Sequence, residues 1–328
     1  MTTVSRPGNK SAPVALVAGA SRGLGLLIAR ELGRQGYSLM ICARTADELE
    51  RGADQLRAAG CTVATARCDV GDAPAVEALV ERTERELGPI EVLVCVAGVI
   101  QVGPLASLNR SHFTSAIDVM LWGPINTALA VVPRMRERGR GHIGIITSLG
   151  GLISAPHLLP YSTAKFGAVG FARGLRSELS GTGVSVTTIA PGLMRTGSHL
   201  RATFVGNQGR EFAWFGTAAS LPLLSMDAER AAERMVRAIL RGQSVLITTP
   251  LAQIAPRVDA LFPRATSALL SVTARLLPNH PGAKSDGATI EGWQAVKKLP
   301  AATRTMVNQL SRLGRTAARR FNEEPGDS

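Results

Sequence analysis

Aromatic residues are scarce in this chain, which has three Trp, two Tyr and eight Phe among its 328 residues. Proteins that bind single-stranded nucleic acids stack bases on aromatic side chains interleaved with basic ones. No aromatic residue interleaves the arginines at positions 304–319, so nucleic acid is not expected as a partner. The scarcity also makes each tyrosine conspicuous wherever one falls in a catalytic pattern.

Cysteine is rarer still. The four cysteines are Cys42, Cys61, Cys68 and Cys95, with no CxxC pair and no histidine at metal-ligand spacing. We therefore expect no metal site, and buried reduced thiols, which agree with a cytoplasmic location. The N-terminus lacks a long apolar run after its basic residues, and no stretch of about 18 apolar residues is free of charge. Neither a signal peptide nor a membrane-spanning helix is predicted.

Acidic residues are outnumbered by basic ones, 25 to 37, which gives a formal net charge of +12. Eleven Lys and Arg against three Asp and Glu lie between residues 251 and 321, so most of the excess is C-terminal. Such a balance suits nucleic acid, a membrane surface or a small anionic molecule. Hydrophobic residues make up 45% of the chain, so a large core can form. Only residues 5–13 and 323–328 have the composition of loose ends.

Short apolar runs alternate with helical stretches through the first 250 residues. Seven runs predict strands over residues 14–18, 38–42, 62–66, 91–96, 143–147, 185–189 and 244–248. Helices between such strands predict an α/β fold: a doubly wound, seven-stranded parallel sheet, Rossmann-like, with a helical C-terminal extension. We expect a main domain over 1–250, including a loop at about 193–226, and an extension over 251–328.

The first predicted strand runs into Gly19-Ala20-Ser21-Arg22-Gly23-Leu24-Gly25, where a helix begins. Glycines spaced G-x-x-x-G-x-G allow a tight turn and let a diphosphate approach the backbone. The new helix offers free N–H groups and the positive end of its dipole to an anion. The pattern alone is also compatible with an ordinary turn from strand to helix.

The stretch from Ala18 to Gly25 resembles the cofactor loop of the short-chain dehydrogenase/reductase family. Three further landmarks match in order over residues 12–250: Asp69-Val70, then Cys95-Val96-Ala97-Gly98 in place of Asn-Asn-Ala-Gly, then Pro191-Gly192 with Thr196. The resemblance implies a nicotinamide dinucleotide cofactor and assembly into homodimers or homotetramers. The cofactor residues that it implies are Gly19, Ser21, Arg22, Gly23, Leu24, Gly25, Asp69, Val70, Ala97, Gly98, Tyr161, Lys165, Pro191, Gly192 and Thr196.

The end of the second predicted strand bears on the choice between the two dinucleotides. An acidic residue there would bind a ribose 2′-OH and repel a 2′-phosphate, but this strand ends in Cys42-Ala43-Arg44. Two guanidinium groups, those of Arg44 and Arg22, would favour the 2′-phosphate of NADP(H). The alternative for Arg44 is a solvated surface arginine.

Three residues form the predicted catalytic set. Tyr161 and Lys165 lie four apart, which places them on one face of a helix, and Ser148 lies thirteen residues before Tyr161. A tyrosine is a poor base near neutrality, and a neighbouring Lys165 ammonium would lower its pKa. Ser148 can bind the substrate oxygen, and the resemblance implies that Lys165 also binds the nicotinamide ribose.

Met120 is a departure from the family pattern, because it holds the position of an Asn that completes a proton relay to water. A thioether cannot replace an amide's donors and acceptor. Either the backbone carbonyl and a water still serve the relay, or catalysis is slowed or lost. The nearby Asn126 is expected to point elsewhere.

The region around the predicted substrate loop is rich in rings, with Phe204, Phe212, Trp214 and Phe215. They indicate an aromatic lid over an apolar substrate, side chains that anchor the loop on the core, or a dimer contact. His157 and His199 are expected at the polar rim of the site.

The extension contains two apolar stretches, 261–277 and 301–321, joined by a predicted linker at 278–287. In the second stretch, Met306, Leu310, Leu313, Ala317 and Phe321 share one face, opposite four arginines. Such a basic amphipathic helix either lies on an anionic membrane or packs on the domain or on a neighbouring subunit.

Together these observations predict an NADP(H)-dependent oxidoreductase that interconverts a carbonyl and a secondary alcohol on an apolar substrate of the steroid, lipid, isoprenoid or aromatic ketone class. The alternative is a non-catalytic NADP(H) sensor or a membrane-associated scaffold.

Overall fold

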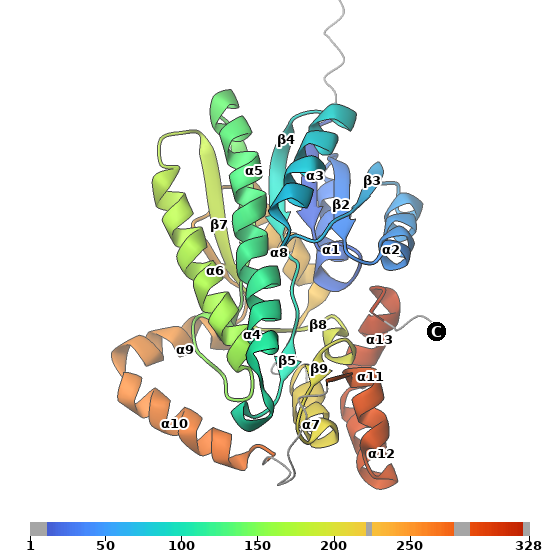
Figure 1. The fold of residues 1–328 in the computed structure, drawn as a ribbon, viewed down its shortest axis with the longest axis vertical. Coiled ribbons are helices and arrows are strands. Elements are labelled where there is room, and N and C mark those ends of the chain that lie inside the picture. The colour runs from blue at the N-terminus through green and yellow to red at the C-terminus, as the bar shows by residue number, and fades with distance from the viewer. Residues whose placement is uncertain (1–11, 221–224, 279–288, 324–328) are drawn as a thin grey trace, which may run out of the picture.

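A computed structural model describes residues 12–220, 225–278 and 289–323, and at its centre is a seven-stranded sheet (Figure 1). The strands are, in spatial order, β11 (Val245–Ile247), β7 (Val184–Ala190), β6 (Gly141–Ile146), β4 (Ile90–Cys95), β1 (Val14–Ala18), β2 (Ser38–Ala43) and β3 (Val63–Arg67). All neighbours in the sheet are parallel. The predicted doubly wound sheet is confirmed. The strand order reverses between β1 and β4, which is where open α/β sheets form a ligand crevice.

The central strands are apolar along their whole length because both faces of the sheet are covered. All five residues of β1 are buried, and Val17 pairs with Ile41 on one side and Val94 on the other. Unbroken runs of Val, Leu and Ile are typical of such doubly covered parallel strands.

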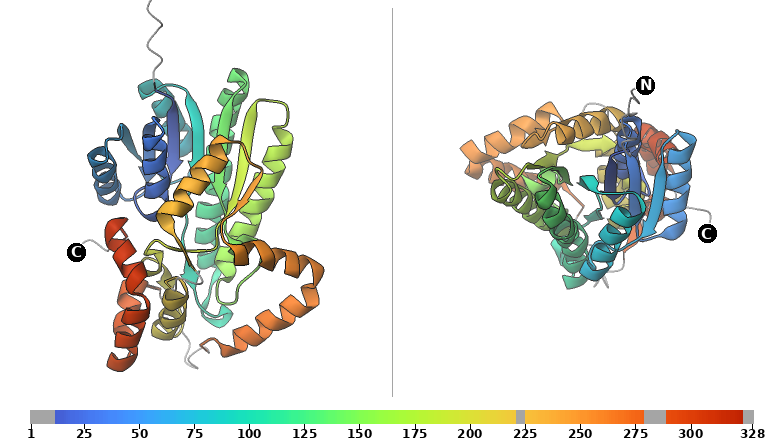
Figure 2. Two further views of the ribbon diagram at one scale, coloured as in Figure 1. Left: turned by 180° about the vertical axis from the view of Figure 1, so that it is seen from behind. Right: turned by 90° about the horizontal axis from the view of Figure 1, so that it is seen from above.

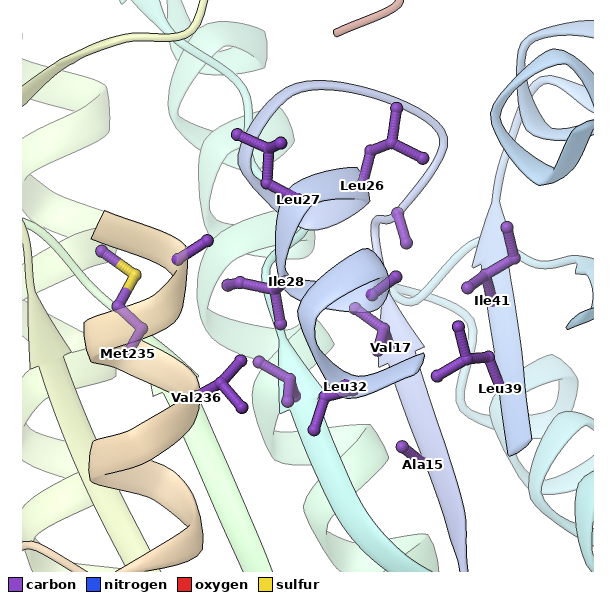
Figure 3. Close-up of a cluster of buried hydrophobic side chains, with 14 of the residues drawn as sticks. Ala15, Val17, Leu26, Leu27, Ile28, Leu32, Leu39, Ile41, Met235 and Val236 are labelled. Carbon is purple, nitrogen blue, oxygen red and sulfur yellow. The ribbon is translucent and has the colours of Figure 1, made fainter. Parts of the chain in front are cut away.

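One face of the sheet is covered by α1 (Gly23–Arg34), α2 (Ala46–Ala58) and α8 (Ala228–Leu240). Figure 3 shows Ile28 and Leu32 of α1 between the sheet and Met235 and Val236 of α8. The side chain of Asp227 accepts the N–H of Arg230 at 3.1 Å and so caps the start of α8.

The other face is covered by α3 (Ala73–Glu86), α5 (Gly123–Arg138) and α6 (Leu159–Glu178), as the view along the sheet shows (Figure 2). A π-helical turn at Asp118–Trp122 joins α4 (Arg110–Ile117) to α5, which begins at Gly123. The continuous helix 110–138 is long and apolar enough to span a membrane by length and composition, but half of its most apolar window is buried. Its place against the sheet is that of a core helix.

A smaller layer lies below the carboxyl ends of the strands (Figure 1). It contains two short sheets and the helices around them: β5 (Gln101–Val102), β9 (Thr203–Phe204) and β12 (Ile290–Glu291); β8 (Leu193–Arg195) and β10 (Ser225–Asp227); α7 (Gln208–Ala218), α11 (Gly292–Ala295), α12 (Ala301–Leu310) and α13 (Arg312–Arg320). Antiparallel pairing of β12 with β9 joins the extension to the loop after β7.

Helices α9 (Pro250–Leu261) and α10 (Pro263–Leu276) project from the body as an arm (Figures 1 and 2). No residue of α10 is buried. The predicted linker at 278–287 lies outside the described residues beyond Pro278.

Two sequence predictions for the end of the chain are wrong. The stretch 301–321 is not one helix, since it breaks at Ser311. Of the predicted apolar face, Met306, Leu310 and Leu313 are exposed, whereas Ala317 and Phe321 are buried as predicted. Glu323 is not in a loose end but is buried, because α13 directs the chain back toward α1.

Candidate active site

The glycine turn lies where β1 ends at the point of strand reversal. Gly19 has φ +91°, and a Cβ there would lie 2.4 Å from the backbone nitrogen of Ala97. A Cβ on Gly25 would lie 1.9 Å from the Gly19 carbonyl oxygen. Both positions therefore require glycine, and the turn brings the start of α1 close to the residues that follow β4.

The start of α1 can receive a diphosphate. An α-helix leaves its first N–H groups without an intrahelical acceptor. In α1 these groups include the N–H groups of Leu24 and Gly25. The N–H of Gly23 instead donates to the carbonyl oxygen of Phe321 at 2.8 Å. Ser21 is buried and Arg22 half-buried in the same turn. The turn fits the phosphate part of a nicotinamide dinucleotide, with one N–H already used by the chain itself.

A cleft of about 790 Å³ opens beside the ends of β2 and β3, on the side where an adenosine would lie. Arg44 and Asp69 are both exposed and line it, together with Asp118. Asp69 accepts the N–H of Gly71 at 3.0 Å, which fixes its carboxylate, and Val70 is buried below. The structure thus brings Arg44 and Asp69 together in one open cleft.

Arg22 does not line that cleft. Its guanidinium forms ion pairs with Glu48 of α2 and with Glu323, the latter at 3.2 Å. Only one of the two arginines expected near the ribose therefore faces the open space.

Ser148, Tyr161 and Lys165 come together at the carboxyl end of β6 and the first turns of α6. Ser148 follows the strand, and its Oγ accepts the N–H of Gly150 at 3.0 Å. The Tyr161 hydroxyl is hydrogen-bonded with Ser148, and Lys165 Nζ lies 5.9 Å from the centre of the tyrosine ring. Strand β6, which ends just before Ser148, pairs with β4, and β4 pairs with β1, which leads into the glycine turn.

The Lys165 ammonium is buried and donates to the carbonyl oxygen of Ile146 at 2.8 Å. Burial lowers its pKa to about 8, although the nearby Cys95 thiol opposes the shift. Burial also raises the pKa of Tyr161, against the hydrogen bond with Ser148, which lowers it. The prediction that the Tyr161 pKa is lowered is therefore wrong for this structure, because desolvation of the phenol outweighs its hydrogen bond with Ser148.

Met120 lies in the π-helical turn and is completely buried. It packs with Ala116, Ala164 and the Tyr161 ring, and its Sδ lies 3.6 Å from the position of a Cβ on Gly98. The surroundings of Met120 are apolar. As predicted, Asn126 points elsewhere, since its amide donates to the carbonyl oxygens of Val70 at 3.0 Å and Gly71 at 3.2 Å.

The segment after β7 borders the same site. The carbonyl oxygen of Pro191 accepts the N–H of Leu149 at 2.8 Å, which ties it to the loop behind Ser148. A Cβ on Gly192 would lie 2.7 Å from the Thr249 hydroxyl. Thr196 is buried, and its hydroxyl accepts the N–H of Ser198 at 3.2 Å.

Most of the rings of the predicted lid pack in the protein interior. Phe204, Phe212 and Phe215 are buried in a separate small core, with Phe204 edge-on to the other two rings at centroid distances of 5.6 and 6.0 Å. The structure therefore favours the alternative that these three rings anchor the loop on the core.

The two histidines differ. His199 is buried between this small core and α13, and burial lowers its pKa to about 4, so the prediction that it lies at the rim is wrong. His157 has left-handed backbone (φ +63°), and its Nδ1 lies 2.9 Å from the buried Glu211 carboxylate. This contact with Glu211 ties the loop before α6 to α7, and Trp214 of α7 donates to the same carboxylate at 2.7 Å.

Several residues beside the site carry no sequence signal of their own. Gly150 and Gly151 allow close packing: a Cβ on Gly150 would lie 3.0 Å from Cε1 of Tyr161, and one on Gly151 would lie 2.6 Å from the Lys165 carbonyl oxygen. The pair of glycines after Ser148 is visible in the sequence, but their contacts with α6 are not. Glu48 and Glu323 became recognisable only through the fold.

Comparisons with known proteins agree with this geometry. Residues 13–203 match the family model for short chain dehydrogenases. A Streptomyces coelicolor protein whose name assigns it as a ketoacyl reductase is 39% identical over 185 residues, which is 56% of this chain and 71% of that protein. The short-chain reductase protein NovJ of Streptomyces niveus is 35% identical over 183 residues, with 56% and 70% covered.

Solved structures show the same likeness. A point variant of actinorhodin polyketide ketoreductase, solved with NADPH, superposes with a TM-score of 0.65 at 30% identity, covering 75% of this chain and 99% of that one. A short-chain dehydrogenase from Streptomyces avermitilis gives a TM-score of 0.69 at 25% identity, with 82% and 99% covered. The two superpositions leave 25% and 18% of this chain unmatched.

Proposed function

This chain belongs to the short-chain dehydrogenase family, and from that premise we propose that it is an NADP(H)-dependent reductase of an apolar ketone. The observation that carries the proposal is the cluster of Ser148, Tyr161 and Lys165 at the end of β6, which only β4 separates from the strand that leads into the glycine turn. Members of the family act as oxidoreductases on carbonyl or alcohol groups with NAD(P)(H).

Each side chain has a distinct task in this proposal. The Ser148 oxygen accepts the Gly150 N–H, which leaves its own O–H to donate to a substrate oxygen. The hydride would come from a bound nicotinamide. Tyr161 supplies the proton to the oxygen that becomes the alcohol, and the Lys165 ammonium stabilises the phenolate that is left. The Gly19–Gly25 turn, Asp69, Val70, Ala97, Gly98, Pro191, Gly192 and Thr196 would hold the cofactor.

The preference for NADP(H) rests on Arg44. It follows β2 directly and is exposed in the adenosine-side cleft. The end of β2 carries no carboxylate that would bind a ribose 2′-OH and repel a 2′-phosphate. An arginine matches a phosphate with two parallel hydrogen bonds. Arg44→Ala should weaken NADPH binding about tenfold and leave NADH binding unchanged, which titration of each dinucleotide measures.

An apolar carbonyl substrate is proposed because apolar side chains border Tyr161. Ala97 and Val99 pack against the same apolar cluster around Met120 as Tyr161 does, and Leu193 is exposed just beyond the end of β7. The names of two similar proteins, a ketoacyl reductase and a polyketide ketoreductase, make ketoacyl compounds the first class to assay.

The test of the proposed reaction uses both tyrosines of the chain. Tyr161→Phe should abolish NADPH oxidation with apolar ketones and still bind NADPH, whereas Tyr37→Phe should behave as the unmodified protein does. Full activity in Tyr161→Phe would refute the assignment of Tyr161.

A second candidate is a non-catalytic NADP(H) sensor, which Met120 favours, since a buried thioether stands where the relay needs an amide. NADPH binding without turnover across the ketone panel, and recovery of turnover in Met120→Asn, would support this candidate. Turnover by the unmodified protein would dismiss it.

For assembly we propose a homodimer or homotetramer through α5 and α6, where Trp122, Leu129 and Phe166 are exposed by 50, 64 and 45%. Leu129→Glu should shift the mass in solution toward the monomer. We keep residues 1–250 as the catalytic domain and 251–328 as an extension whose arm exposes Leu269 and Leu276. Co-sedimentation with anionic vesicles tests membrane contact by this arm.

A further inference from the structure

The last described residues of the chain lie against the glycine turn at its beginning. The carbonyl oxygen of Phe321 accepts the Gly23 N–H at 2.8 Å, and the Asn322 amide donates to the Ser21 carbonyl oxygen at 2.8 Å. A Cβ on Gly23 would lie 2.2 Å from a carboxylate oxygen of Glu323. Residues 321–323 therefore form one wall of the cofactor turn.

This wall is held firmly in place. Phe321 is 4% exposed and belongs to the same core cluster as α1 and α8. Arg320 pairs with Glu229 of α8 at 3.0 Å, which fixes the end of α13. Asn322 has left-handed backbone (φ +57°), a conformation that Asn tolerates better than most residues, and its amide also donates to the Glu48 carbonyl oxygen at 3.0 Å.

The charges at this wall converge on Arg22. Its guanidinium contacts carboxylates of both Glu48 and Glu323, and the Glu323 side chain is only 6% exposed. Arg201, from the loop after β7, pairs with Glu48 at 2.9 Å, and its Nε donates to the Glu323 carbonyl oxygen at 3.1 Å. Arg22 is thus held by two carboxylates on the turn where a dinucleotide phosphate would bind.

A 2′-phosphate that approached Arg22 would meet these carboxylates. Like charges at such distances repel strongly in a partly buried site, so Arg22 could bind the phosphate only after giving up a carboxylate. NADH, which has a hydroxyl in that position, meets no such competition. Burial raises the pKa of Glu323 to about 7, and the nearby guanidinium groups of Arg22 and Arg201 oppose this shift.

We propose that Glu323 is a specificity-determining residue of the cofactor site: by holding Arg22 against Glu48 it weakens the binding of a 2′-phosphorylated dinucleotide and leaves binding of the unphosphorylated one nearly unchanged. The inference rests on the proposed NAD(P)(H) function. It assigns to the C-terminal extension a part in cofactor selection, with Arg44 as the arginine that favours the phosphate and Glu323 as the residue that opposes it.

The test is titration of the full-length protein with NADPH and with NADH. Glu323→Gln keeps the shape of the side chain and removes its charge, and it should tighten NADPH binding about fivefold or more while changing NADH binding less than about twofold. The matched control is Glu229→Gln, which removes a carboxylate from the Arg320 contact but does not touch Arg22, and should change neither affinity.

A double-mutant cycle checks that the effect passes through Arg22. In an Arg22→Gln background, Glu323→Gln should no longer alter NADPH binding, since no guanidinium remains to be released. Removal of residues 323–328, which retains Phe321 and Asn322, gives a second variant with the same expected selectivity.

Two results would overturn the proposal. Weaker NADPH binding in Glu323→Gln would mean that Glu323 orients Arg22 toward the phosphate, and equal changes for both dinucleotides would mean that the wall acts on the turn as a whole. Failure of the unmodified protein to bind either dinucleotide would instead refute the proposed function itself.

Discussion

Two buried ionisable groups, Lys165 and Glu323, lie at opposite ends of the candidate site, and their surroundings differ in charge. The Lys165 ammonium has a backbone carbonyl as its hydrogen-bond partner, and among the described residues no carboxylate pairs with it. Glu323 instead lies between two arginines, with Glu48 nearby. Burial dominates both pKa shifts, down to about 8 for Lys165 and up to about 7 for Glu323.

The difference teaches how each end is prepared for a ligand. An unmatched buried cation is unfavourable in the folded protein and becomes favourable when negative charge develops beside it, as on a tyrosinate. At the glycine turn, the chain has already neutralised its own arginine before any phosphate arrives. At the catalytic end, we therefore expect the buried ammonium to lower the stability of the fold. At the turn end, we expect the carboxylates to compete with a phosphate for Arg22.

The largest effect should come from removal of the unmatched charge. Lys165→Met should lower turnover by about 10³-fold, because Tyr161 loses its cationic neighbour. It should also raise the free energy of unfolding by about 1 kcal/mol, because an apolar side chain replaces a buried ammonium. Assays and thermal denaturation measure both, with the exposed Lys298→Met as control. A loss of stability in Lys165→Met would contradict this account of the catalytic end.

The wall at the turn end can be compared with the projecting arm. Phe321→Ala should destabilise the protein by about 3 kcal/mol, since it leaves a cavity in the core beneath α1. Leu276→Ala, at a residue 81% exposed in α10, should change stability by less than about 0.5 kcal/mol. Urea denaturation of the two variants measures both changes in the free energy of unfolding. Similar values would mean that residues 321–323 are as loosely attached as the arm.

The free energy of unfolding should also depend on pH with opposite sign at the two ends. Glu323 has a raised pKa, so its stabilising contribution is present below about pH 4.5 and is lost as pH rises through about 7. Lys165 has a lowered pKa, so its unfavourable burial persists below about pH 8 and is relieved as pH rises toward 10.5.

Each change in the free energy of unfolding should amount to about 3 kcal/mol, and it should vanish in the corresponding variant, Glu323→Gln or Lys165→Met. Unfolding curves from pH 4.5 to 10.5 would show them. The groups that face Glu323 and share in its titration are Arg22, Arg201, Glu48 and Glu291. Persistence of the acid-side slope in Glu323→Gln would assign it to these neighbours.

The smallest effect concerns the packing around Tyr161. Gly150→Ala should reduce kcat about fivefold, since the added Cβ would press on the tyrosine ring and turn its hydroxyl away from Ser148. Gly174→Ala, where a Cβ meets open space in α6, should leave kcat unchanged and slightly stabilise the helix. Equal kcat values would show that the ring has room to move.

Much of the architecture follows from local patterns. The first strand matches its predicted range, 14–18, to the residue, and the seven-stranded sheet and its helices follow from apolar runs whose burial is decided by near neighbours. The placement of Tyr161 and Lys165 on one helix face follows from their spacing alone. These features need only a few consecutive residues, which is why the sequence predicts them.

The errors concern contacts between distant segments. The ring of His199 is buried because α13, more than a hundred residues later, covers it, and the break at Ser311 turns the buried face of 301–321 toward Val307 and Gly314. The pKa of Tyr161 depends on total burial, which no spacing reveals. The pairing of Arg22 with Glu323 likewise joins residues about three hundred positions apart.

The contact of residues 321–323 with residues 21–23 has a consequence for biosynthesis. The first strand and turn to leave the ribosome can pair with β2 and β4 early, but the Gly23 N–H reaches its acceptor only after Phe321 has emerged from the exit tunnel. Closing so long a loop is slow and late in folding. For most of its synthesis, a nascent chain would therefore present a glycine turn that residues 321–323 do not yet contact and that is open to a dinucleotide. A cofactor that binds at that stage would occupy the turn before residues 321–323 reach it.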